Sequence, residues 1–106
     1  QGKRIFSRST VETMIRDQIN LMPLVPNAQK VMIRGGLGWR LAPSSCWGFF
    51  GDFLSPGSFG HGGATGTVFW ADPKRDITFA LLTTQPSIWS SSLLNKASNL
   101  AIACVN

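Results

Sequence analysis

Apolar residues recur at helical spacing near the start of the chain. Ser9 precedes them at the N-cap position and Glu12 follows three residues later, which is the capping-box arrangement that opens a helix. The pattern predicts a short amphipathic helix over residues 10–19. Its apolar positions are Val11, Met14, Ile15 and Ile19.

Prolines and glycines divide the next forty residues into short pieces. Pro23 and Pro26 end the helical pattern and open an irregular segment. The glycines within residues 35–38 predict a turn, and residues 39–42 then read as a strand. Residues 43–56 are too aromatic for a solvated linker and too broken for a helix. They form either a covering loop or another strand.

Two β-rich segments dominate the second half of the chain. Residues 65–71 and 77–83 are predicted strands, and residues 72–76 between them have the composition of a turn. The second strand carries apolar residues at successive positions, so that both of its faces are expected to be buried. This favours a central antiparallel strand that is covered by helices.

A final helix is predicted after three serines, residues 90–92, that can cap its start. The apolar residues that follow are expected to form one buried stripe. The stripe consists of Leu93, Leu94, Ala97, Leu100, Ala101 and Cys104. The order of the elements predicts an α+β fold, with an antiparallel sheet flanked by an N-terminal and a C-terminal helix.

Composition and charge restrict the possible size, function and location of the protein. The 106 residues are 43% hydrophobic, which suits one small folded unit. The net charge is +5, but the basic residues are scattered, which favours a solvated surface over nucleic-acid binding. Cys46 and Cys104 could form a disulfide or remain as buried thiols, so the cysteines do not decide the cellular compartment of the protein. No stretch of the sequence approaches the length of a membrane span.

The strongest chemical signal is residues 59–67, Phe-Gly-His-Gly-Gly-Ala-Thr-Gly-Thr, which hold the single histidine of the chain. One histidine without neighbouring Cys, Asp or Glu does not make a metal site. The segment lacks the lysine and the strand-to-helix context of a phosphate loop or a dinucleotide fingerprint. Two interpretations remain. The glycines either let a strand pass close under a neighbouring element, or expose backbone N–H groups to an oxyanion.

Several segments together resemble the C-terminal part of the serine β-lactamase-related hydrolases. These segments are residues 7–18, the Gly-Leu-Gly-Trp-Arg run of residues 36–40, the histidine segment, the turn at 72–76, and Leu-Leu-Thr-Thr at 81–84. The family includes class C β-lactamases, D-alanyl-D-alanine carboxypeptidases, D-aminopeptidases and related esterases. Its Lys-Thr-Gly element often appears as His-Thr-Gly or His-Gly-Gly in the esterase-like branch.

The resemblance implies a role for each residue of the His-Gly-Gly strand. His61 would stand at the active-site cleft, where the family's lysine or histidine orients substrate and tunes the local charge. Gly62 replaces a threonine that contacts a carboxylate, which suits an esterase or amidase better than a β-lactamase. Gly63 would allow close approach, and the N–H of Ala64 would be one of two oxyanion-hole donors.

The nucleophile side of that active site is missing from the sequence. None of the eleven serines has a lysine three residues later, so the family's Ser-x-x-Lys is absent. The chain has no tyrosine for Tyr-x-Asn, and Ser92 and Asn95 have the wrong spacing for Ser-x-Asn. Residues 1–106 are therefore expected to be a single partial domain, a C-terminal fragment of a longer hydrolase.

The expected parent is a serine hydrolase that works through an acyl-enzyme on an ester, a D-amino-acid amide or peptide, or a β-lactam. The fragment should be inactive alone, should need no cofactor, and should find its partner in the chain that carries Ser-x-x-Lys. The alternative is a non-catalytic binding or scaffolding module, whose exposed sheet edge and residues 47–53 would bind another chain.

Three further groups of residues have structural explanations. The tryptophans are expected to pack in the core or at its edge. These are Trp39, Trp47, Trp70 and Trp89. Arg40 is expected on a solvated strand face. Asp72 and Asp76 bracket a turn, where they should cap backbone groups and not form an acid–base pair.

Overall fold

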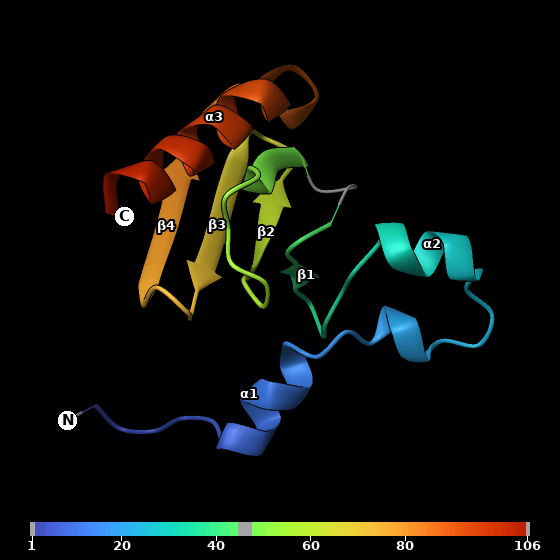
Figure 1. Cartoon of the computed structure of the whole chain (residues 1–106). Coiled ribbons are helices and arrows are strands. Elements are labelled where there is room, and N and C mark those ends of the chain that lie inside the picture. Colours follow the sequence, from blue (N-terminus) through green and yellow to red (C-terminus); the bar gives the residue numbers. More distant parts are fainter. Residues whose placement is uncertain (1, 45–47, 106) are drawn as a thin grey trace.

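A four-stranded antiparallel sheet, in the order β1-β2-β3-β4, forms the centre of the protein (Figure 1). The computed structural model describes residues 2–44 and 48–105. The strands are β1 (Arg40–Leu41), β2 (Phe59–Gly63), β3 (Thr67–Asp72) and β4 (Ile77–Leu82). Consecutive strands are neighbours throughout, so short turns connect β2 to β3 and β3 to β4.

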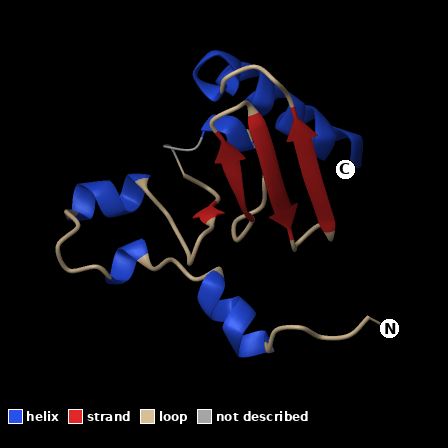
Figure 2. Ribbon diagram, turned by 180° about the vertical axis from the view of Figure 1, so that it is seen from behind, coloured by secondary structure: helices blue, strands red, loops and turns tan. Residues whose placement is uncertain are grey.

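Helices lie on one face of this sheet and beside it. The helices are α1 (Arg8–Met14), η1 (Ile19–Leu21), α2 (Asn27–Met32), η2 (Gly48–Phe50) and α3 (Ser87–Val105). The long α3 crosses one face of the sheet, whereas α1, η1 and α2 lie away from that face (Figures 1 and 2). The predicted α+β architecture, an antiparallel sheet with helices at both ends of the chain, is confirmed.

The first helix begins and ends earlier than the sequence predicted. Ser7, not Ser9, is the N-cap, because its Oγ accepts a hydrogen bond of 3.1 Å from the N–H of Thr10. The helix ends at Met14, whose carbonyl oxygen accepts the N–H of Leu37 at 2.8 Å. The glycine loop at residues 35–38 therefore donates to a carbonyl group that would accept a hydrogen bond within the helix if the helix were longer.

Pro26 starts a helix in the segment that was predicted to be irregular. Its carbonyl oxygen accepts the N–H groups of Gln29 and Lys30, and α2 follows directly. Proline is compatible with the first turn of a helix because the first N–H groups have no partner there. In the aromatic segment, η2 packs against α3, which confirms the covering loop for that part. Residues 45–47, with Cys46 and Trp47, lie outside the described residues.

The second hairpin differs from the prediction in two ways. The strand predicted over residues 65–71 begins at Thr67, because residues 64–66 form the turn from β2 to β3. In this turn the N–H of Gly66 donates to the Gly63 carbonyl oxygen at 3.0 Å, and Gly66 has a φ of 83°. The prediction that β4 is central was wrong, because it is an edge strand of the described sheet and its alternate residues are exposed.

The core lies between β3 and α3. Trp70 is fully buried and stacks on Phe79 at a centroid distance of 5.1 Å. Its Nε1–H donates to Ser98 Oγ at 3.0 Å, and that hydroxyl donates to the Phe49 carbonyl oxygen at 3.1 Å. One serine therefore links β3, α3 and η2. The predicted packing role is confirmed for Trp70, whereas the side chain of Trp89 lies outside the described residues.

The apolar stripe predicted for the last helix is divided between two faces. Leu94, Ser98 and Ile102 are buried, whereas Leu93 and Leu100 are exposed. Residues four apart share a face of a helix, so the 94–98–102 row faces the sheet and its neighbours turn away. Cys104 is an exposed free thiol, so the prediction that it is buried was wrong.

Asp72 ties the end of β3 to the turn that follows and to the loop before β2. The buried carboxylate accepts the N–H of Lys74 at 3.1 Å and of Ser55 at 3.0 Å, and pairs with Arg75 Nη1 at 2.8 Å. Burial raises the pKa of Asp72, but the hydrogen bonds from Ser55 and Arg75 outweigh it and lower the pKa from 3.8 to about 2. The predicted turn-capping role is confirmed for Asp72.

We expect Asp72→Asn to lower the free energy of unfolding by about 2 kcal/mol at neutral pH, from the lowered pKa. Because the pKa is lower in the folded state, this stabilisation is complete above pH 3.8 and is lost as the pH falls towards 2. Urea unfolding at a series of pH values measures it. Asp76→Asn, in the same turn, is the control and should keep the wild-type profile. Equal acid sensitivity of wild type and Asp72→Asn would contradict the assignment.

Candidate active-site strand

The His-Gly-Gly segment lies on β2, with His61 on the face of the sheet away from α3. A Cβ on Gly60 would meet the Phe69 carbonyl oxygen and lie 2.7 Å from Trp70 Cα, and one on Gly62 would lie 3.0 Å from the Phe49 ring. The even positions of β2 therefore face the core. Because side chains alternate along a strand, His61 points to the opposite face, where it is exposed.

These contacts explain two of the glycines by packing. A side chain at position 60 would collide with the backbone of β3, which cannot move without breaking the sheet. A threonine at position 62 would press on Phe49, which packs against the core. The close-approach interpretation of the glycines is thus supported at Gly60 and Gly62.

Ala64 follows the strand at the tip of the β2–β3 hairpin. It is exposed and occupies the second position of the four-residue turn that the Gly66–Gly63 hydrogen bond closes. Among the described residues, the N–H of Ala64 donates no hydrogen bond. A backbone N–H that is free in this way can donate a hydrogen bond to a carbonyl oxygen or an oxyanion from outside the chain.

His61 stands between two hollows on the outer face of the sheet. One, of about 280 Å³, is lined on its apolar side by Phe69, Ala80 and Leu82. The other, of about 190 Å³, is lined by the glycine loop at 35–38 and by Arg40. His61 borders both hollows, so a ligand in either would lie beside this residue.

An aromatic cluster next to His61 was not predicted from the sequence. Trp39 packs edge-on against Phe59 at 5.3 Å and tilts against Phe69 at 6.1 Å. The three residues come from β2, β3 and the residue before β1, and Phe69 pairs with His61 in the sheet register. The only available signal was the presence of aromatic residues at odd positions of each predicted strand.

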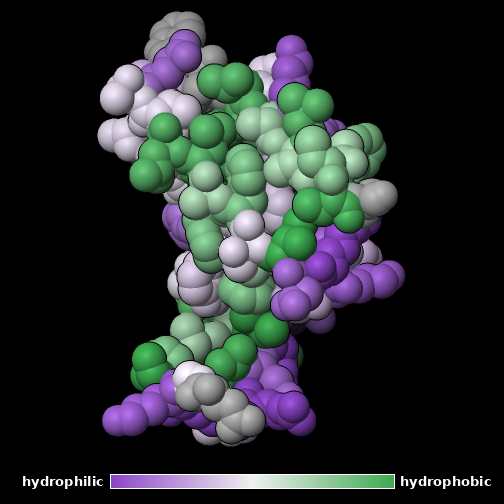
Figure 3. Space-filling model, turned by 90° about the vertical axis from the view of Figure 1, so that its left-hand side faces the viewer, coloured by the Kyte–Doolittle hydropathy of each residue, from purple (hydrophilic) through white to green (hydrophobic). Residues whose placement is uncertain are grey.

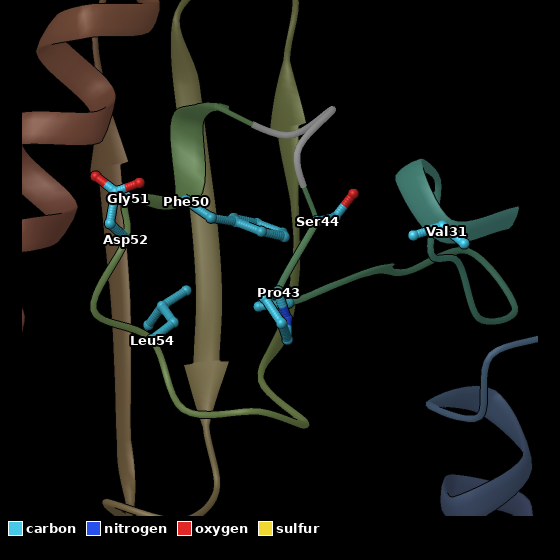
Figure 4. A pocket seen from close by; sticks show the side chains of 8 residues that line it. Val31, Pro43, Ser44, Phe50, Gly51, Asp52 and Leu54 are labelled. Atoms are coloured by element: carbon cyan, nitrogen blue, oxygen red, sulfur yellow. The ribbon is translucent and has the colours of Figure 1, made fainter. Parts of the chain in front are cut away.

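A larger hollow of about 420 Å³ lies away from His61 (Figure 4). Phe50 and Leu54 border it on one side, Pro43 and Ser44 on another, and Val31 lies across it on α2. Its acidic group, Asp52, accepts a hydrogen bond from Asn99 Nδ2 at 3.2 Å. This hollow therefore offers an apolar space and no arrangement of catalytic groups.

The uncovered side of the sheet is apolar. β4 has no charged residue and no proline along its open edge, and Leu82 is 81% exposed. Figure 3 looks at the molecule from the side of β4 and shows hydrophobic side chains over much of this surface. Edge strands in soluble proteins are usually protected by charges, prolines or a covering element.

The described residues contain no cluster of three or more His, Cys, Asp or Glu side chains that could hold a metal ion. Within the same residues, no helix has the length and apolar character needed to cross a bilayer.

Comparisons with known proteins agree on one family. A family model described as Beta-lactamase matches residues 4–101. A protein of Escherichia coli (strain K12), whose name describes it as a D-alanyl-D-alanine carboxypeptidase, is 40% identical over 52 residues, which are 48% of this chain and 12% of that protein. The crystal structure of a beta-lactamase from Mycobacterium bovis has the same fold, with a TM-score of 0.70 and 23% identity.

The matched part of each relative is short. The structural match covers 93% of this chain but 38% of the Mycobacterium bovis chain. The chain thus spans well under two thirds of the length of either relative.

Proposed function

The chain belongs to the Beta-lactamase family, and we propose that it is the part of a serine hydrolase that supplies the His-Gly-Gly strand and one oxyanion-hole donor. The observation that carries the proposal is the free N–H of Ala64 at the end of β2, next to the exposed His61. In this proposal the 106 residues are a partial domain, and the nucleophile lies outside them.

The absence of a nucleophile from the sequence supports this division. No serine of the chain is followed by lysine three residues later, and there is no tyrosine. A serine hydroxyl is a weak nucleophile until a neighbouring base removes its proton. The chain therefore has groups that stabilise a transition state but none that begins the reaction.

The uncovered apolar surface also supports a missing partner segment. The helices α1, η1 and α2 contain no buried residue, and their apolar side chains Val31 and Leu21 are strongly exposed. Helices this short gain most of their stability from packing against other elements. We propose that the segment carrying Ser-x-x-Lys covers these helices and the outer face of the sheet.

The proposed reaction is acyl transfer in two steps. The serine Oγ attacks the substrate carbonyl carbon, and its proton passes through the lysine to the departing alcohol or amine. The negative charge that develops on the carbonyl oxygen is stabilised by the N–H of Ala64, which is already oriented. Water then attacks the acyl-enzyme, and the acid is released as the serine recovers its proton.

The family points to small-molecule substrates, and the strand narrows the class. Gly62 has no hydroxyl to bind a substrate carboxylate, and its Cβ direction faces Phe49, not the cleft. An ester or a D-amino-acid amide therefore suits the strand better than a β-lactam. His61 would orient such a substrate, and Gly63 would let it approach the strand.

We expect the isolated chain to hydrolyse neither a chromogenic cephalosporin nor a p-nitrophenyl ester, because no activated serine is present. The full-length hydrolase should turn over at least one of them. Turnover by the purified chain that depends on one of its own serines would overturn the proposal.

A second function is favoured by one observation, the open and uncharged edge of β4. A non-catalytic module could use this edge to bind another chain by strand addition. Size-exclusion chromatography with mass measurement separates the two. A larger co-purifying polypeptide with Ser-x-x-Lys supports the hydrolase, and a stable monomer encoded by its own short reading frame supports the module.

A further inference from the structure

One hydrogen bond determines which nitrogen of His61 carries the proton. Nδ1 lies 2.6 Å from the carbonyl oxygen of Gly62. A carbonyl oxygen can only accept, so Nδ1 must be the donor. A neutral imidazole carries a single N–H, which leaves Nε2 with its lone pair exposed.

The surroundings of the ring leave Nε2 open to a ligand. Among the described residues, the imidazole ring of His61 makes no other hydrogen bond. No acidic residue lines either hollow beside it, and Arg40 is the charged residue that lines one of them. No carboxylate of these hollows therefore competes with a ligand for Nε2.

We infer that His61 Nε2 is a hydrogen-bond acceptor for the substrate, and that the group it binds is an amide N–H, an ammonium or a hydroxyl. This inference rests on the proposed function of β2 as an active-site strand. A carboxylate oxygen would be disfavoured beside Nε2, because both atoms are acceptors and neither supplies a hydrogen. A lysine at this position would have the opposite preference, because its ammonium only donates.

The strand then offers two complementary groups within four residues. The N–H of Ala64 donates to a carbonyl oxygen, and Nε2 of His61 accepts from a nearby donor group on the same molecule. An ester or amide that bears an amine or hydroxyl close to its carbonyl satisfies both. The same molecule with a carboxylate at that place satisfies only one.

The tautomer can be measured directly because the chain has one histidine. Long-range ¹H–¹⁵N correlation spectra of ¹⁵N-labelled protein should show a protonated Nδ1 and an unprotonated Nε2 once the imidazole is neutral. A protonated Nε2, or an equal mixture of both forms, would overturn the inference. The measurement of the tautomer does not depend on turnover. An inactive full-length protein would therefore overturn the proposed function and leave the result for the tautomer unaffected.

Substrate preference is tested in the full-length hydrolase with two p-nitrophenyl esters, one ending in an ammonium and one in a carboxylate. Wild type should favour the ammonium ester, and His61→Lys should shift the ratio of kcat/KM about tenfold towards the carboxylate ester, as expected for one charge-assisted hydrogen bond. Leu100→Lys adds the same charge on the exposed side of α3, across the sheet from His61, and should leave the ratio unchanged. An unchanged ratio in His61→Lys would overturn the inference.

Discussion

Ala64→Pro should lower the kcat of the full-length hydrolase by about 10²- to 10³-fold, the usual effect of removing one oxyanion-hole donor. Proline has no N–H, so the substitution deletes the proposed donor. The fold should tolerate it, because Ala64 is the second residue of a four-residue turn closed by the Gly66–Gly63 hydrogen bond. Proline is favoured at that position.

Ala64→Ser is the matched control because it keeps the backbone donor and changes only an exposed side chain. We expect it to retain kcat within about threefold, since exposed substitutions have small effects. Urea unfolding of both variants should give midpoints close to wild type. A fully active and stably folded Ala64→Pro hydrolase would show that the oxyanion is bound elsewhere.

Trp70→Ala should have the largest effect on stability, a loss of about 3–5 kcal/mol in the free energy of unfolding. The ring is fully buried between β3 and α3 and stacks on Phe79. Its removal leaves a cavity and takes away the donor to Ser98. Equilibrium urea unfolding followed by circular dichroism measures the loss.

Two variants separate the contributions of Trp70. Trp70→Phe keeps an aromatic ring but lacks Nε1–H, so it should cost less than alanine and still destabilise the protein. Trp39→Ala removes a half-buried tryptophan from the opposite face of the sheet, and should cost less than Trp70→Ala. If Trp39→Ala were the more damaging, the core would not lie between β3 and α3.

The sequence predicted the β3–β4 hairpin and the last helix because both have strong local signals. The predicted start of that helix was wrong, because α3 begins at Ser87 and the serines at 90–92 lie inside it. The position of β4 in the sheet could not be predicted in the same way. Apolar residues on both faces of residues 77–83 indicate that both faces are covered, but the outer face is open among the described residues. A local pattern shows what a strand is able to bury and does not show which neighbours are present.

The site was predictable only where it is contiguous in sequence. His61, Gly62, Gly63 and Ala64 follow one another in the sequence, so locating one of them locates all four. The cluster of Trp39, Phe59 and Phe69 depends on the register between strands, which no local pattern fixes. The hydrogen bond from His61 Nδ1 to the Gly62 carbonyl oxygen depends on the rotamer of the histidine, which no sequence pattern predicts.

The uncharged edge of β4 has a practical consequence for handling the chain. As the concentration of purified protein rises, two such edges can add to each other, since nothing on the strand repels a second copy. Added salt would not disperse the resulting aggregates, because no charges on the strand are being screened. We therefore expect the solubility of the chain to be limited by six residues whose sequence, Ile-Thr-Phe-Ala-Leu-Leu, is otherwise that of an ordinary interior strand.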